Sequence, residues 1–208
     1  MIGPLLAALA AYLIGSLSFA VIVSRAMGLA DPRTFGSGNP GATNVLRSGS
    51  KAAAVVTLAL DAFKGWLPVM LIQWFGAAHG LGEGAQALAG VAAFLGHLYP
   101  VFFRFAGGKG VATAAGVLLA FAPWLGAAAL LTWLIVALLS RYASLASMVA
   151  GVLAPAYYLL GDGRLWLASG EKTLAMGAMG LLLLWRHREN IQRLMAGNES
   201  KLGSKKRS

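Results

Sequence analysis

Cysteine is absent from the sequence and charged residues are scarce. None of the 208 residues is a cysteine, which excludes a disulfide scaffold, thiolate catalysis and cysteine-bound metals. Charged residues make up 12% of the chain, about half of the ~25% usual in soluble proteins. Only 7 residues are acidic and they form no cluster, so we expect no divalent-metal site and no cofactor.

The residues that are present are mostly apolar. Hydrophobic residues make up 58% of the chain and the mean hydropathy is +0.71, so a water-soluble fold would lack enough polar surface to cover itself. The sequence therefore predicts an all-α integral membrane protein with a single domain over residues 1–208. The net charge of +10 would favour nucleic acid as the partner of a soluble chain. In a membrane protein it indicates orientation, and we expect no nucleic-acid partner.

Uncharged or nearly uncharged runs divide the chain into membrane spans. A hydrocarbon core of ~30 Å requires about 20 apolar residues in a helix. The run from 111 to 140 is uncharged for 30 residues, so it is either one long tilted helix or two short helices that turn near Pro123–Gly126. The two-helix interpretation gives seven spans, at approximately 4–24, 52–75, 84–104, 111–123, 126–140, 144–160 and 167–186.

The distribution of lysine and arginine decides between six and seven spans. Six spans put equal numbers of basic residues on the two sides, whereas seven spans put 14 of the 17 on one side and 2 on the other, with Lys64 inside a span. Because basic residues tend to remain cytoplasmic, we expect seven transmembrane helices with the N-terminus outside. The long functional loops and the C-terminus would then be cytoplasmic, with a basic tail at 193–208 near anionic headgroups.

The segment Phe35–Arg47 is rich in glycine and small hydrogen-bond donors. Its glycines and Pro40 allow a tight backbone whose N–H groups converge into a nest suited to an anion. Arg47 adds a planar guanidinium for phosphate or carboxylate. Gly36–Gly41 also matches G-x-G-x-x-G, but it follows an apolar span instead of a strand, so a dinucleotide site is rejected. The residues predicted to bind an anion are Ser37, Gly38, Asn39, Gly41, Thr43, Asn44 and Arg47.

A second glycine-rich segment stands at the start of a predicted span. Backbone N–H groups, the positive end of a helix dipole and an ammonium group would meet there, an arrangement that suits a phosphate. The glycine spacing of a Walker A loop is absent. The residues predicted to bind this phosphate are Gly107, Gly108, Lys109 and Gly110.

Two pairs of polar residues mark the cytoplasmic ends of the last two spans. Ser144 and Ser147, at i and i+3, face the same way and could both donate to a ligand, although small hydroxyl residues also pack helices. His187 and Asn190 have the same spacing just after the last span, where a histidine could position a substrate or relay a proton. We expect the serines to bind substrate, and His187 and Asn190 to be catalytic.

Asp61 and Lys64 lie within the predicted span 52–75, three residues apart. Ionisable groups at that depth are costly, so we expect the two side chains to pair and to face the bundle interior. The sequence leaves open whether they support the site or only fix the packing of helices. His97, in the following span, is expected to be an interior histidine with satisfied hydrogen bonds.

These segments together resemble those of a known family. The motifs at Gly36–Arg47, Gly107–Thr113 and His187–Ile191 are similar to those of the bacterial acyl-phosphate:glycerol-3-phosphate acyltransferases (PlsY type), and the resemblance extends over essentially the whole chain. It implies a multi-pass enzyme of the bacterial inner membrane. Such an enzyme moves a fatty acyl group from acyl-phosphate to the 1-hydroxyl of sn-glycerol 3-phosphate, giving lysophosphatidic acid and inorganic phosphate. Its partners would be both substrates, membrane lipids and an upstream enzyme that supplies acyl-phosphate.

The resemblance also implies roles for individual residues. The essential positions of the family correspond to Ser37, Arg47, Lys109, His187 and Asn190, with Ser144 or Ser147 less securely placed. Ser37 is expected to be catalytic, together with His187 and Asn190. The general base stays open between His187 and the substrate's own phosphate, and a covalent acyl group on Ser37 is the competing mechanism.

A small-anion membrane transporter is the alternative function. It would also contain anion nests and charges within the membrane. Transporters place their site near the membrane midplane at broken helices, often within inverted repeats. Here the motifs fall on one predicted face of the membrane and no internal repeat is visible, which favours the enzyme.

Overall fold

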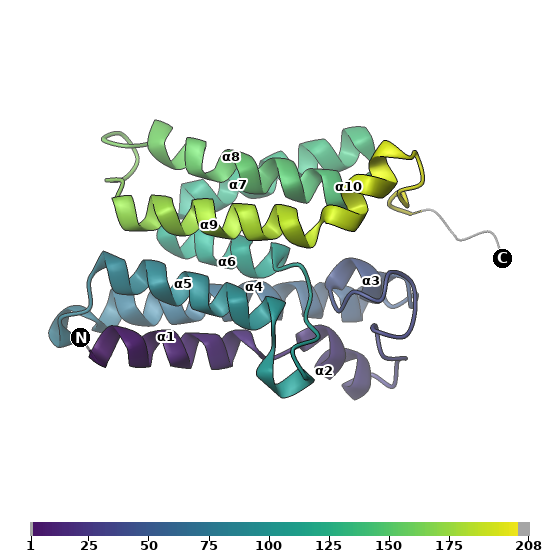
Figure 1. Cartoon of the computed structure of the whole chain (residues 1–208), viewed down its shortest axis with the longest axis horizontal. Helices are drawn as coiled ribbons and strands as arrows, with labels where there is room; N and C mark the ends of the chain where they lie inside the picture. The colour runs from purple at the N-terminus through teal and green to yellow at the C-terminus, as the bar shows by residue number, and fades with distance from the viewer. Residues whose placement is uncertain (1, 204–208) are drawn as a thin grey trace.

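The computed structural model describes residues 2–203, and the fold is made of helices (Figure 1). Within this range the pairing of extended backbone is limited to an isolated bridge between Asp162 and Trp166. The predicted all-α class is therefore confirmed. The elements are α1 (Ile2–Gly15), α2 (Phe19–Ala26), α3 (Ala42–Leu46), α4 (Lys51–Phe75), α5 (Glu83–Leu98), α6 (Val111–Phe121), α7 (Pro123–Ser140), α8 (Ala143–Leu160), α9 (Gly170–Arg186) and α10 (Arg188–Met195), with 3-10 turns at Ala77–His79 and Val101–Phe103.

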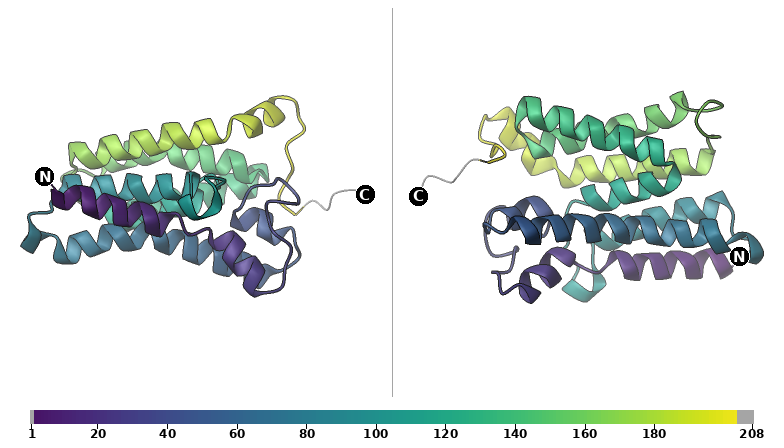
Figure 2. Two further views of the ribbon diagram at one scale, coloured as in Figure 1. Left: turned by 60° about the horizontal axis from the view of Figure 1, so that its bottom comes forward. Right: turned by 180° about the vertical axis from the view of Figure 1, so that it is seen from behind.

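The longer helices run side by side along the long axis of the molecule. Helix α1 packs on α5, α4 on α6, and α8 on both α7 and α9. The short helices α2, α3 and α10 lie together at one end, close to where the described part of the chain finishes (Figures 1 and 2). The bundle therefore has one end that carries most of the irregular chain, and we call it the loop end.

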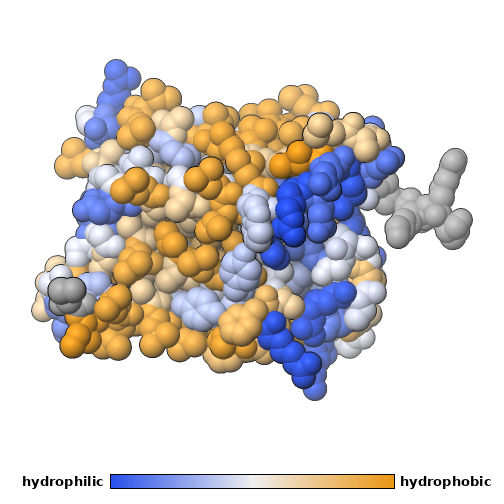
Figure 3. All heavy atoms as spheres, viewed as in Figure 1, coloured by the Kyte–Doolittle hydropathy of each residue, from blue (hydrophilic) through white to orange (hydrophobic). Residues whose placement is uncertain are grey.

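The surface between the two ends of the bundle is apolar. Figure 3 shows hydrophobic side chains covering most of the visible face and a broad hydrophilic area at the loop end. Five segments of the described chain are long and apolar enough to cross a membrane, namely Ile2–Ala26, Lys51–Phe75, Glu83–Phe103, Pro123–Ser140 and Ala143–Leu160. Helices α6 and α9 are shorter, at 11 and 17 residues. The count of seven spans therefore stays a prediction.

The run from 111 to 140 forms two helices, as the distribution of charge predicts. Helix α6 ends at Phe121, and Ala122 has an extended backbone with φ −158°. Pro123 then occupies the first turn of α7, where its fixed φ suits a helix start and its missing N–H costs nothing. The break, at Ala122, falls one residue before the turn predicted at Pro123–Gly126.

The first predicted span, 4–24, falls within the candidate span Ile2–Ala26, but it is not one continuous helix. Helix α1 stops at Gly15, and the chain continues through a short non-helical step before α2 begins at Phe19. The carbonyl of Leu17 in this step accepts a hydrogen bond from Lys64 Nζ at 2.6 Å. A buried cation thus satisfies a backbone acceptor that the break leaves without a helical partner.

Glycines bring neighbouring helices into close contact. A Cβ atom on Gly15 of α1 would lie 2.1 Å from the carbonyl oxygen of Ala93 in α5. A Cβ on Gly116 of α6 would lie 1.9 Å from that of Ala62 in α4. Without a side chain at these positions the backbones can touch, which is how membrane helices gain packing energy in the absence of a hydrophobic driving force.

Candidate active site

Lys109 and Asn190 come together at the loop end although they are far apart in the sequence. The Lys109 ammonium donates a hydrogen bond to Asn190 Oδ1. Gly110 precedes α6 with φ +80°, and a Cβ there would lie 2.2 Å from the Phe94 ring. Only glycine fits this left-handed, crowded position, so the loop is fixed in the conformation that directs Lys109 toward α10.

Glu199 joins the residues around Asn190 into one cluster. Its Oε1 accepts hydrogen bonds from Ser144 Oγ and Asn190 Nδ2, both at 2.6 Å. Its Oε2 accepts one from Arg193 Nε at 2.8 Å. Sequence reasoning missed Glu199 because it placed the residue in the basic tail at 193–208, outside the motifs.

The first half of the basic tail predicted at 193–208 folds against the bundle. Helix α10 ends at Met195, and the chain then folds back so that Leu202 exchanges two hydrogen bonds with Arg141: its N–H donates to the Arg141 carbonyl at 2.7 Å, and its carbonyl accepts from Arg141 Nη2 at 3.1 Å. These contacts hold Glu199 against the start of α8. The remainder of the predicted tail, 204–208, lies outside the described residues.

Burial sets the charge state of this cluster. Desolvation, with further repulsion from Arg193, lowers the pKa of Lys109 to about 8. Burial alone would raise the pKa of Glu199, but hydrogen bonds from Ser144 and Arg193 outweigh it and keep this pKa below its usual value. At neutral pH the cluster therefore contains an ionised carboxylate and a lysine that is still mostly protonated.

His187 is buried at the junction of α9 and α10 and is neutral. Its Nδ1 lies 2.8 Å from the carbonyl oxygen of Leu183, and desolvation lowers the pKa of His187 to about 4. Because a carbonyl can only accept, the neutral ring carries its proton on Nδ1. Nε2 then presents a lone pair, which makes the ring an acceptor for a substrate hydroxyl.

Arg186 holds the second glycine-rich segment in place. Its Nη2 donates to the carbonyl of Gly107 at 2.9 Å and its Nε to that of Gly108 at 3.1 Å. A Cβ on Gly108 would also lie 3.0 Å from the carbonyl oxygen of Pro40, so the two predicted anion loops touch at this point. Sequence reasoning missed Arg186 because a cation at the end of a span is usually a solvated one.

The first glycine-rich loop is shaped from within by Asn44. The buried side chain of Asn44 donates to the carbonyls of Pro32 and Phe35 at 2.6 and 3.1 Å, and its Oδ1 accepts from the N–H of Ser37 at 3.0 Å. The side-chain amide of Asn44 therefore forms its hydrogen bonds within the loop, and Asn44 holds the loop's backbone in position. The predicted ligands that remain exposed or half-buried on this loop are Ser37, Gly38, Asn39, Gly41, Thr43 and Arg47.

The serine pair divides between two roles. Ser144 belongs to the cluster through Glu199, whereas Ser147 donates to the carbonyl of Ala143 at 2.8 Å and accepts from Trp133 Nε1 at 3.0 Å. Ser147 thus joins α7 to α8, and substrate binding by the two serines stays a prediction. Asp61 and Lys64 pair as predicted, at 2.7 Å inside the bundle.

The all-helical bundle of residues 2–203, with an apolar belt and one polar end, indicates a multi-pass integral membrane protein. The chain belongs to the family described as glycerol-3-phosphate acyltransferase, whose pattern matches residues 5–197. The resemblance found in the motifs is confirmed by this match.

Relatives and solved structures agree with this assignment. A glycerol-3-phosphate acyltransferase of Albidiferax ferrireducens is 65% identical over 99% of this chain and 92% of its own length. One from Paraburkholderia phytofirmans is 63% identical over 98% and 93%. Two crystal structures of PlsY, an integral membrane glycerol 3-phosphate acyltransferase, are similar in fold. The glycerol 3-phosphate form has a TM-score of 0.86 at 39% identity, covering 96% of both chains. The lysophosphatidic acid form has 0.85 at 38%, covering 96% of this chain and 95% of its own.

Proposed function

We propose that this protein transfers a fatty acyl group from acyl-phosphate to the 1-hydroxyl of glycerol 3-phosphate, releasing lysophosphatidic acid and inorganic phosphate. Its family membership and the glycerol 3-phosphate and lysophosphatidic acid forms of the similar PlsY structures support this activity. The observation that carries the proposal is the joining of two glycine-rich loops and a Lys109–Asn190–Glu199 cluster at one end of an apolar bundle. Both substrates carry a phosphate, and one also carries a lipid tail.

The loop end is proposed to face the cytoplasm of a bacterial inner membrane. The positive-inside count supports this orientation, since 14 of the 17 basic residues fall on the side of the loop end when α6 and α7 are both counted as spans. The proposed spans are α1 with α2, then α4, α5, α6, α7, α8 and α9. This places the N-terminus outside and both substrates within reach of cytoplasmic supply, including an upstream enzyme that makes acyl-phosphate.

The chemistry needs a hydroxyl oxygen to attack the acyl carbon while the bond from that carbon to the phosphate oxygen breaks. Lys109 and Arg47 bind the phosphates, and the N–H groups of the glycine loops, with Ser37, stabilise the developing negative charge. His187 accepts a hydrogen bond from the neighbouring 2-hydroxyl of glycerol 3-phosphate, which leaves the proton of the attacking 1-hydroxyl free to move, and Asn190 orients Lys109. With a pKa of about 4, His187 is a weaker base than a phosphate dianion with its second pKa near ~6. The proton therefore passes to the phosphate of glycerol 3-phosphate.

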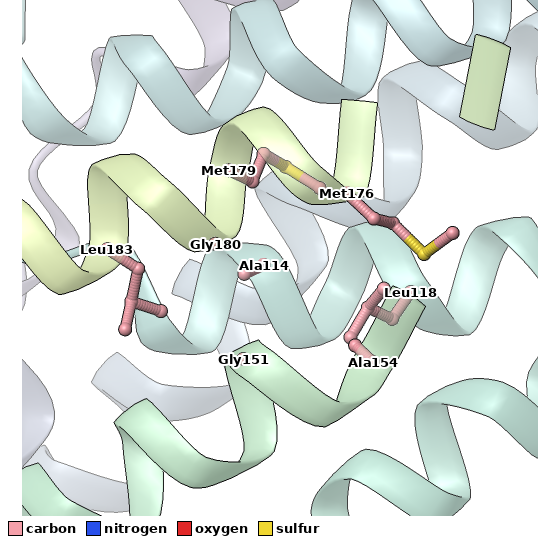
Figure 4. Close-up of a pocket in the computed structure, with 8 residues that line it drawn as sticks. All are labelled: Ala114, Leu118, Gly151, Ala154, Met176, Met179, Gly180 and Leu183. Atoms are coloured by element: carbon pink, nitrogen blue, oxygen red, sulfur yellow. The ribbon is translucent and has the colours of Figure 1, made fainter. Parts of the chain in front are cut away.

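The acyl chain is proposed to lie along an apolar pocket that has Leu183, one helical turn before His187, in its lining. Figure 4 shows this apolar pocket between α6, α8 and α9. Leu183 lies one helical turn from His187, and Met176 lies about 16 Å along the same helix at 1.5 Å per residue. Gly151 and Gly180 bring α8 and α9 into close contact beside it, because a Cβ on Gly180 would lie 3.3 Å from the carbonyl oxygen of Gly151. The pocket is lined by Ala114, Leu118, Gly151, Ala154, Met176, Met179, Gly180 and Leu183.

Filling this groove should change which acyl chains are accepted. In the Gly180→Leu variant the new side chain would occupy the groove about 10 Å below His187, so kcat/KM for hexadecanoyl phosphate relative to decanoyl phosphate should fall by about tenfold. Gly177→Leu is the matched control, because a Cβ at Gly177 meets nothing within 4 Å. Equal effects of the two variants on the ratio would place the acyl chain elsewhere.

The activity itself is tested with purified protein in detergent. Acyl-phosphate and glycerol 3-phosphate together should release inorganic phosphate and form lysophosphatidic acid in equal amounts. Acyl-CoA should not support the reaction, because the short loops at the site offer no surface for its long nucleotide arm. Comparable rates with acyl-CoA would contradict the proposed donor. Phosphate flux into protein-containing vesicles, without any acyl transfer, would favour the transporter.

A further inference from the structure

A cluster of polar side chains lies buried inside the bundle, apart from the residues placed in the reaction above. It consists of Asp61 and Lys64 on α4, His97 on α5 and Thr113 on α6, and each is at most 7% exposed. Lys64 Nζ lies 2.7 Å from Asp61 Oδ1 and 2.6 Å from the carbonyl oxygen of Leu17. The cluster therefore links the break between α1 and α2 to three other helices.

Helix packing alone does not account for these buried charges. Close glycine contacts already join the helices involved: α1 to α5 at Gly15 and Gly96, and α4 to α6 at Gly65 and Gly116. A buried ion pair is often no more stabilising than apolar residues of similar volume, and charges at this depth in a membrane protein usually mark a functional site. The contacts of His97 show where that function lies.

One edge of the His97 ring contacts Thr113 and Asp61, and the other edge supports the loop at Gly108. Its Nδ1 lies 3.2 Å from Thr113 Oγ1 and 3.7 Å from Asp61 Oδ1. Its Nε2 lies against Gly108, since a Cβ on that glycine would be only 2.3 Å away. The backbone carbonyl of His97 also accepts a hydrogen bond from the Gly108 N–H at 3.1 Å.

We infer that His97 is a positioning residue for the phosphate-binding loop at Gly107–Gly110, with its ring orientation fixed by Thr113 and the Asp61–Lys64 pair. Arg186 holds the carbonyls of this loop from the other side, at 2.9 and 3.1 Å. The loop is thus clamped between a membrane-embedded ring and a cation at the end of α9. Lys109 is the next residue, so its ammonium takes the position that this clamp sets. Outer groups of this kind tune affinity without touching the ligand.

Two substitutions of His97 separate support of the loop from simple packing. The His97→Asn side chain reaches the position of Nδ1 and can still contact Thr113. It leaves empty the space next to Gly108 that Nε2 fills. The His97→Gln side chain reaches the position of Nε2 and keeps that support. We expect His97→Asn to raise KM for one phosphate substrate by about tenfold, with kcat within threefold of the native value. In the His97→Gln variant, KM should stay within threefold of the native value.

The inference rests on the proposed function for the identity of the ligand. Binding of inorganic phosphate to the intact detergent-solubilised protein, measured by calorimetry, tests the inference without depending on acyl transfer. His97→Asn should weaken phosphate binding by the same tenfold, even if the wild-type protein shows no acyl transfer. Thr113→Val, which removes the partner of Nδ1 with little change of volume, should produce the same pattern to a lesser degree and serves if His97→Asn does not fold.

The matched control is Thr57→Val. Thr57 lies one turn before Asp61 on α4, is fully buried, and its hydroxyl has no hydrogen-bond partner among the described residues. The Thr57→Val variant should leave KM, kcat and phosphate binding unchanged. The inference is overturned if His97→Asn keeps native phosphate affinity and KM. It is also overturned if His97→Asn and His97→Gln lose thermal stability and kcat together while KM stays native, since His97 would then be a packing residue only.

Discussion

Lys109→Ala is expected to lower kcat/KM for acyl transfer by about a hundredfold. A hydrogen bond to a charged group is worth roughly 1.5–3 kcal/mol, and the substitution removes such a bond to phosphate. It also leaves Asn190 Oδ1 without the donor that it has in the structure. Release of inorganic phosphate from acyl-phosphate, measured over a range of glycerol 3-phosphate concentrations, gives the value directly. A loss of less than threefold would contradict the placement of a phosphate at Lys109.

The pH profile of Lys109→Arg provides the control for charge. A lysine with its pKa lowered to about 8 is protonated below that pH and loses its charge above it. In the wild-type protein kcat/KM should therefore fall above about pH 8, while kcat, which reports the substrate complex, should hold to higher pH because bound phosphate favours the ammonium. A guanidinium stays charged throughout, so the Arg variant should lose this alkaline limb whatever its absolute rate. An unchanged limb would assign it to another group.

Glu199→Ala is expected to have an effect of similar size and also to lower the melting temperature. Its carboxylate accepts hydrogen bonds from Ser144, Asn190 and Arg193. An unpaired buried polar group costs about 1–3 kcal/mol, and the loss would also leave Lys109 without its nearby negative charge. We expect kcat/KM to fall by more than a hundredfold and thermal unfolding of the detergent-solubilised protein to begin several degrees lower.

Glu189→Ala is the matched control for Glu199→Ala. It removes the same charge from the same region, but the Glu189 side chain is 70% exposed and its carboxylate lies 4.0 Å from Arg193. Exposed pairs of this kind contribute little, so activity should stay within about threefold. Glu199→Gln adds a second comparison, because an amide cannot accept all three bonds. If Glu189→Ala were as damaging as Glu199→Ala, the effect would be one of net charge and not of the cluster.

The sequence predicts the helical class, the division of the run from 111 to 140 and the pairing of Asp61 with Lys64, because each depends on residues close together along the chain. The role of Glu199 could not be predicted. It contacts Ser144 across 55 positions, just as Arg186 contacts Gly108 across 78. Hydropathy and motif spacing describe neighbours in sequence, so they place residues on elements but do not say which distant elements meet.

The break after Gly15 could not be predicted for a related reason. The run that contains it is uncharged, and its composition is typical of a continuous span. What ends α1 is an approach by another element: the Lys64 ammonium reaches the Leu17 carbonyl, and Gly15 packs against the backbone of α5. Such partners become visible only when the helices are placed relative to each other.

The groove between α6, α8 and α9 has a consequence for how the protein meets its substrates. Ala114, Gly151 and Gly180 keep part of their surface exposed, so the groove opens at the side of the bundle toward the lipid. An acyl chain bound there, as proposed above, would leave by sliding sideways, without its tail ever crossing water. Encounter with the lipid substrate then depends on the mole fraction of that substrate in the bilayer plane, which is a two-dimensional density. Glycerol 3-phosphate, in contrast, arrives from a three-dimensional solution.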